Sequence, residues 1–221
     1  GHFYNHVLGL PYLAAEDKVS AEEVLGLCDN MTPQASSNER PCAMGIDVGS
    51  KLHVVCIEPG ARTKVRFIGE LKNFEELDAV MLRYNVRNAV IDALPETRKS
   101  REFVERNKFK SWVCYYSDNL KGEYSWNEGE RIVTANRTES LDAGTLAFTR
   151  KSLVLPQRSE MVEEFAKHCA NTAKVAEENR ETGSKRYVYK KLGPDHFRHA
   201  LNYAMIAASR MKSGPVISIM R

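Results

Sequence analysis

The sequence predicts a mixed α/β domain, with a central sheet flanked by helices and a β-hairpin before the last helix. Two observations lead to this fold class. Short apolar runs bounded by turn residues indicate strands, and longer segments with apolar residues at helical spacing indicate helices, in the order β-β-β-α-β-α-β. In addition, 221 residues with 43% hydrophobic and 28% charged residues are typical of one main globular domain.

Three strands open the predicted domain. Residues 42–47 are an apolar run that ends on an acid, and Gly49-Ser50 then turns the chain into a second apolar run at 52–57. After Pro59-Gly60, residues 64–70 alternate between polar and apolar, as a half-buried strand does. The short turns between these segments predict that the three strands are antiparallel.

Helices and strands alternate in the middle of the chain. Asn73 is a good cap for an amphipathic helix over about 73–84, and a buried strand follows at 88–92. Pro95 ends that strand. We then expect a helix at 97–107 and a strand at 111–116.

The last third is predicted to end in a hairpin and a helix. We expect a short strand at 130–135, followed by helices at 138–149 and 159–171. Segments 174–180 and 185–191 flank the turn-forming residues 181–184, which indicates the hairpin. The final helix is expected from Asp195 to about Arg210, after Gly193-Pro194.

The bulk properties restrict the class of protein. A net charge of +3 permits a nucleic-acid partner without requiring one. The five cysteines are scattered without a C-x-x-C pair, so neither a disulfide framework nor a zinc site is indicated. No apolar run approaches the roughly 20 residues of a membrane span, and no signal peptide opens the chain. We therefore expect a soluble, intracellular protein with no membrane partner.

Three aspartates are the candidate metal ligands. Asp47 and Asp92 each lie at the end of an apolar strand, where a carboxylate is costly to bury unless a cation or donor meets it. Asp195 opens the last helix, with His199 and Asn202 on its face. Each alone also fits an ordinary turn or helix-start acid. Together they suit two Mg²⁺ or Mn²⁺ ions about 3.5–4 Å apart, the arrangement that hydrolyses phosphodiesters.

Three segments carry a family resemblance: GIDVGSK at 45–51, VIDALPE at 90–96 and PDHFRHALNYA at 194–204. Together with NRTESLD at 136–142 and Leu155-Pro156, they resemble the nuclease domain of phage large terminase subunits. The resemblance covers roughly 41–210. It implies an RNase H-like (retroviral integrase-like) fold, with Asp47, Asp92 and Asp195 as catalytic residues and metal ligands of a two-metal site.

The same resemblance implies a function and partners. The activity would be cleavage of double-stranded DNA, trimming concatemeric viral DNA during genome packaging in the cytoplasm of an infected bacterium. The full-length protein would carry an N-terminal ATPase domain and work with a portal and a small terminase subunit. Residues 3–12 resemble the exit from that motor, so we expect 1–40 to be its tail and linker, 41–213 the nuclease domain and 214–221 a tail. No G-x-x-x-x-G-K-[ST] motif is present, so no ATPase activity is expected.

Several further residues are candidates for supporting roles. Glu96 fits an extra ligand or a surface acid at a helix start, and His199 fits a contact to the substrate or to the ligands, whereas we expect His196 to be exposed. Tyrosines alternate with basic residues in the predicted hairpin, which suits DNA binding, although nearby glutamates offset much of the charge. The DNA-contact candidates are Lys51, Arg98, Lys99, Arg101, Arg180, Lys185, Arg186, Tyr187 and Lys190.

Other classes of protein remain open. A transposase or junction resolvase of the same fold also suits residues 45–55, and a catalytically silent DNA-binding or docking module needs no metal at all. An actin-like ATPase or sugar kinase also begins with a D-x-G turn. That class needs a second, repeated domain, for which this chain has neither the length nor a second such motif.

Overall fold

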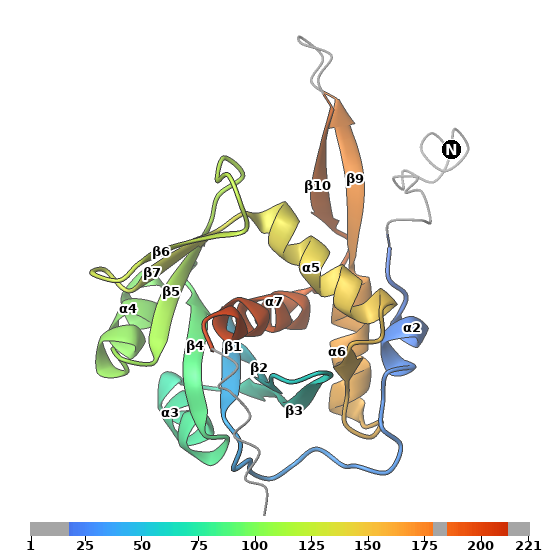
Figure 1. Cartoon of the computed structure of the whole chain (residues 1–221), viewed down its shortest axis with the longest axis horizontal. Coiled ribbons are helices and arrows are strands. Elements are labelled where there is room, and N and C mark those ends of the chain that lie inside the picture. Colours follow the sequence, from blue (N-terminus) through green and yellow to red (C-terminus); the bar gives the residue numbers. More distant parts are fainter. Residues whose placement is uncertain (1–17, 179–184, 212–221) are drawn as a thin grey trace, which may run out of the picture.

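The computed structural model describes residues 18–178 and 185–211 and is built around an eight-stranded mixed sheet (Figure 1). The strand order is β6-β7-β5-β4-β1-β2-β3-β8. Strands β1 (Cys42–Val48), β2 (Leu52–Glu58) and β3 (Thr63–Leu71) are antiparallel neighbours, as the short turns predicted. The predicted α/β class with a central sheet is therefore confirmed.

The remaining strands extend the sheet on both sides. Strands β4 (Val86–Asp92) and β5 (Ser111–Tyr116) lie parallel to β1, and β7 (Ile132–Ala135) lies parallel to β5. Edge strand β6 (Tyr124–Asn127) and the two-residue β8 (Leu153–Val154) were not predicted. The predicted strand 130–135 starts at Ile132, because Glu130 and Arg131 belong to the turn after β6.

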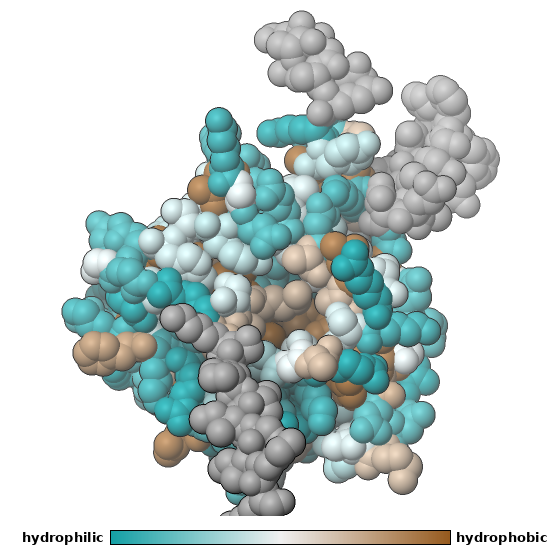
Figure 2. All heavy atoms as spheres, viewed as in Figure 1, coloured by the Kyte–Doolittle hydropathy of each residue, from teal (hydrophilic) through white to brown (hydrophobic). Residues whose placement is uncertain are grey.

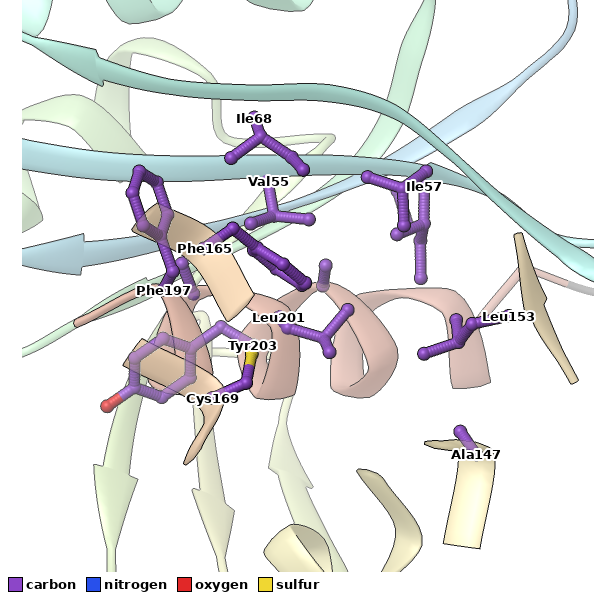
Figure 3. Close-up of a cluster of buried hydrophobic side chains, with 14 of the residues drawn as sticks. Val55, Ile57, Ile68, Ala147, Leu153, Phe165, Cys169, Phe197, Leu201 and Tyr203 are labelled. Atoms are coloured by element: carbon purple, nitrogen blue, oxygen red, sulfur yellow. The ribbon is translucent and has the colours of Figure 1, made fainter. Parts of the chain in front are cut away.

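Helices cover both faces of the sheet. On one face lie α3 (Phe74–Arg83) and α4 (Thr97–Arg106), whose apolar residues form a core with alternate residues of β1, β2 and β4. On the other face lie α5 (Arg137–Thr149), α6 (Glu160–Ala170) and α7 (His196–Ser209). In Figure 3, Val55 and Ile68 of the sheet lie beside Phe165 of α6 and Leu201 of α7.

Helix α7 packs unusually close to β1. A Cβ atom added to Gly45 would lie 2.0 Å from the carbonyl oxygen of Ala200 and 2.2 Å from the amide nitrogen of Ala204. Any side chain at this position would therefore collide with the helix backbone. Glycine at position 45 lets α7 lie directly on the strand that carries Asp47.

The residues before β1 belong partly to the same core. The described residues begin at Lys18, and the short helix α2 (Ala21–Leu25) packs against α6. Val24 and Leu27 are buried in the core on the α7 side of the sheet. The backbone of Cys28 also forms an isolated parallel β-bridge with Leu155, the residue after β8. This part of the predicted linker is thus packed on the domain.

A hairpin projects from the molecule just before α7, as predicted (Figure 1). Its strands are β9 (Thr172–Glu178) and β10 (Lys185–Lys191), and the predicted turn at 181–184 lies outside the described residues. Tyr189 is buried, and its hydroxyl forms 2.9 Å hydrogen bonds with Asp142 and Thr145 of α5. Tyr189 therefore holds the hairpin on the domain, whereas the sequence pattern had suggested a nucleic-acid contact.

The surface is mostly hydrophilic on the face that Figure 2 shows. Hydrophobic side chains gather in the middle of this face, where α7 lies in Figure 1. Within the described part of the chain, each helix is too short or too polar to cross a lipid bilayer.

Candidate metal centre

Asp47 and Asp92 lie side by side on adjacent parallel strands. The register pairs Gly45 with Val90 and Ile46 with Ile91, so one further step places Asp47 opposite Asp92. Residues two apart in a strand share a face, and both Gly45 and Val90 face α7. Both carboxylates therefore point to the α7 side from strands that are about 4.8 Å apart.

The beginning of α7 lies at the same end of the sheet. His196, the first residue of the helix, forms a 2.9 Å hydrogen bond between Nδ1 and Asp47 Oδ2. At the other end of the helix, the carbonyl of Ala207 accepts a 2.7 Å hydrogen bond from Asn88 at the start of β4. The helix thus runs antiparallel to β1 and β4. This direction brings Asp195, which directly precedes the helix, to the strand ends that carry the other two acids.

Asp195 is 4% exposed, and the side chains of Lys191 and His199 contact its carboxylate. Lys191 Nζ lies 2.9 Å from Oδ1, and His199 Nε2 lies 3.3 Å from Oδ2. Burial raises the pKa of Asp195, but the hydrogen bonds and charges of His199 and Lys191 outweigh it and lower the pKa to about 2. Asp195 is therefore a carboxylate at neutral pH, ready to bind a cation.

A hydrogen-bonded chain orients His199. Its Nδ1 lies 3.1 Å from the hydroxyl of Tyr116, and that hydroxyl accepts a 2.9 Å hydrogen bond from Asn202 Nδ2. Since the amide of Asn202 occupies one lone pair of the hydroxyl, the proton of Tyr116 is available for His199 Nδ1. This arrangement leaves Nε2 of His199 as the donor to Asp195.

The pKa of Asp92 is shifted in the opposite direction to that of Asp195. Burial, together with the negative charge of Asp47, raises the pKa of Asp92 to about 6, against the lowering effect of a backbone hydrogen bond. That bond comes from the amide of Leu94 to Oδ1, at 3.2 Å. A bound cation would stabilise the ionised form of Asp92, which burial and the neighbouring charge disfavour.

Two histidines adjoin Asp47. His53 of β2 is the cross-strand partner of Asp47, and its ring stacks on that of His196 with 4.4 Å between centroids. Three side chains, those of Asp47, His53 and His196, can each offer one ligand atom. These three atoms lie within 4.8 Å of one another. No other set of three Asp, Glu, His or Cys residues meets this criterion within residues 18–178 and 185–211. The three aspartates thus share one end of the sheet without forming so tight a group.

Other candidates from the sequence lie on the opposite face. Glu96, which precedes α4, is half-buried and 2.8 Å from Lys99 Nζ. It lines a cavity of about 300 Å³ between the turn after β1 and helices α3 and α4, together with Lys51, Arg98 and Lys99. Arg101 donates to the carbonyl of Glu130. Glu96, Lys51, Arg98 and Lys99 therefore lie beside the turn that follows Asp47, whereas Arg101 contacts the turn between β6 and β7.

The basic residues of the hairpin are partly neutralised. Arg186 and Lys190 both form ion pairs with Glu177. Tyr187 is 57% exposed, and Lys174 Nζ lies 5.4 Å from the centre of its ring. Arg180 and the side chain of Lys185 lie outside the described residues. An aromatic and basic surface therefore remains on the described hairpin, with less net charge than its arginines and lysines alone suggest.

Sequence reasoning missed the two histidines. We expected His196 to be exposed, which is wrong: it is only partly exposed and bonded to Asp47. His53 was treated only as part of an apolar strand. A tight turn at Gly49-Ser50 pairs residues symmetrically across it, so the register that places Val48 beside Leu52 also places Asp47 beside His53. The pairing of Asp47 with His53 can therefore be predicted from the position of the turn in the sequence.

Comparisons with known proteins add no relative. A scan against protein-family models, a search of curated proteins and a search of solved structures each returned no match.

Proposed function

We propose that the chain is a metal-dependent endonuclease domain of the RNase H-like class that cleaves double-stranded DNA. The observation that carries the proposal is the pairing of Asp47 and Asp92 on adjacent parallel strands, with Asp195 brought to the same end by α7. The RNase H-like class implied by the resemblance uses acids on a first strand, a fourth strand and a late helix. The proposed role is that of a phage large terminase nuclease in packaging.

The donor set is compatible with divalent cations. The pKa of Asp195 is low, whereas burial and the negative charge of Asp47 disfavour the ionised form of Asp92. Bound Mg²⁺ or Mn²⁺ would activate water and stabilise charge on the attacking and leaving oxygens. Asp47, Asp92 and Asp195 would hold these ions, and His199 would orient Asp195 through their hydrogen bond.

DNA would approach along the end of the sheet where the acids lie. Lys51 lies in the turn after β1, and the hairpin with Arg186 and Tyr187 ends four residues before Asp195. Both could contact phosphates or bases on either side of the scissile bond. Contacts on both sides of the scissile bond suit a double-stranded substrate.

Cleavage of supercoiled plasmid with Mn²⁺ or Mg²⁺ tests the proposal. We expect the wild-type protein to nick and linearise the plasmid, and Asp47→Asn, Asp92→Asn and Asp195→Asn each to lower the rate at least about a hundredfold. Even the loss of residues that merely support metal ligands costs up to that factor. The matched control is Asp78→Asn, which removes an exposed ion pair with Arg106 on the opposite face.

Each outcome has a defined meaning. If the wild-type protein leaves plasmid intact with both metals, the nuclease proposal fails for this chain. Cleavage that persists in all three variants would reject the three-aspartate site. A synthetic four-way junction supplied beside the plasmid separates a packaging nuclease from a junction resolvase, because the resolvase would cut the junction and spare linear duplex.

A further inference from the structure

We propose that Asp47, His53 and His196 form a binding site for one divalent transition-metal ion, such as Co²⁺, Zn²⁺ or Mn²⁺. Their ligand atoms lie within 4.8 Å of one another. Ligands on opposite sides of an ion with bonds of about 2.1 Å are about 4.2 Å apart, so small side-chain movements close the site. One carboxylate and two imidazoles favour such ions over Mg²⁺.

His53 is arranged as metal-binding histidines are. It is 6% exposed, and its Nε2 lies 3.3 Å from Glu70 Oε1, while the other oxygen of this carboxylate, Oε2, contacts Lys51. Its Nδ1 is buried and makes no hydrogen bond with the residues that the structure describes. A carboxylate on one ring nitrogen fixes the tautomer and leaves the other nitrogen with a free lone pair, as in carboxylate–histidine–metal triads. A buried nitrogen without a partner is costly, and a bound ion would satisfy it.

The hydrogen bonds of the other two rings in the cluster distinguish a ligand from a non-ligand. His196 has its Nδ1 hydrogen-bonded to Asp47, and the ion would replace this bond. His168 completes the ring cluster, but its Nε2 is 3.1 Å from Glu164 and its Nδ1 accepts from the amide of Phe197. Both of its nitrogens are occupied, so it is not a ligand.

This inference goes beyond the proposed nuclease, because it concerns metal binding without DNA and names two ligands that the three-aspartate site does not contain. Asp47 is common to both sites. Asp92 belongs only to the proposed nuclease site, whereas His53 belongs only to this one. These two residues therefore separate the two claims experimentally.

Calorimetric titration with Co²⁺ alone, supported by its visible absorption spectrum, tests the site. We expect one tight Co²⁺ ion per chain that millimolar Mg²⁺ does not displace. His53→Ala and His196→Ala should each weaken binding more than about tenfold, and Glu70→Gln, which removes the partner of His53, by about 10–100-fold. His168→Gln is the matched control and should leave the affinity unchanged. Since His53 is buried, the partly exposed His196→Ala decides the test if the first variant does not fold.

Equal Co²⁺ affinity in wild type and His196→Ala, or full displacement of Co²⁺ by Mg²⁺, would overturn the site. Asp92→Asn should retain Co²⁺ affinity. If Co²⁺ binds in a manner that depends on His196 while plasmid stays intact with every metal, the nuclease fails and the metal site stands. If plasmid is cut but the histidine variants bind Co²⁺ normally, the nuclease stands and this site is rejected.

Discussion

Gly45 determines how closely the helix and the sheet approach at the candidate site. Its missing side chain lets the backbone of α7 lie on β1 two residues before Asp47. The hydrogen bond between His196 and Asp47 depends on this approach, because both atoms are on short or rigid side chains. Gly45, which has no side chain, therefore determines the position of α7 and with it the position of Asp195.

Gly45→Ala should destabilise the fold by about 1–3 kcal/mol or more, because the added methyl group collides with backbone atoms of α7 that cannot rotate away. Urea unfolding followed by circular dichroism measures the change. Gly60→Ala is the matched control, since the nearest atom to its added Cβ would be 3.5 Å away. Equal stability of the two variants would contradict the tight contact.

At the residue scale, the acids of the candidate site can be predicted from the sequence more readily than its histidines. Asp47 and Asp92 stand out because a carboxylate at the end of an apolar strand is costly without a partner. His53 is unremarkable in its strand until the pairing with Asp47 is known. The proximity of His196 to Asp47 joins residues that are 149 positions apart, and only the packing of α7 determines it.

At the scale of elements, the hairpin and α5 behave as one packed unit. Tyr189 bonds to two residues of α5, and Arg137 of α5 donates to the carbonyl of Tyr189 at 2.8 Å. Lys174 of β9 also pairs with Asp142. The hairpin is therefore anchored at its base, next to the start of α7.

Tyr189→Phe should loosen this anchor, because it removes hydrogen bonds to Asp142 and Thr145 that are together worth about 1–3 kcal/mol. Amide hydrogen exchange should accelerate in β9 and β10 but not in β1. Tyr187→Phe, at a 57% exposed position, is the control and should have no effect. Unchanged exchange in the hairpin of Tyr189→Phe would show that the anchor lies elsewhere.

Most long elements could be predicted from their own residues, and the short ones could not. The three opening strands, the buried strands β4 and β5 and helix α7 each carry a regular apolar pattern. β8 has two residues and α2 has five, which is too few for any periodicity. The order of strands across the sheet depends on long-range pairing, which local patterns do not encode.

At the scale of the whole molecule, residues of the described segment before β1, 18–41, contribute to the core of the domain. Val24 and Leu27 pack in the same core as residues of α6 and α7. The expected division at residue 41 came from polar composition over 31–40, which does not reveal whether the preceding apolar residues have a partner. The sequence pattern therefore does not predict the burial of Val24 and Leu27.

Leu27→Ala should lower the free energy of unfolding of the entire domain by about 2–5 kcal/mol, the usual cost of a cavity at a buried leucine. Tryptophan fluorescence in urea reports it, because Trp112 and Trp126 lie on the distant β5 and β6. Met31→Ala, at an 88% exposed position of the same segment, should leave the transition unchanged. A Leu27→Ala transition identical to wild type would mark the segment as an independent appendage.

The contact between Gly45 and α7 also restricts how this protein can diverge. A side chain at position 45 would force the helix to stand off from the strand, and Asp195 would move away with it. Relatives that keep the site should therefore combine glycine two residues before the first acid with a close-packed helix face at Ala200 and Ala204. Such a paired signature, which joins a backbone contact to the acids, distinguishes true relatives more sharply than the aspartates do alone.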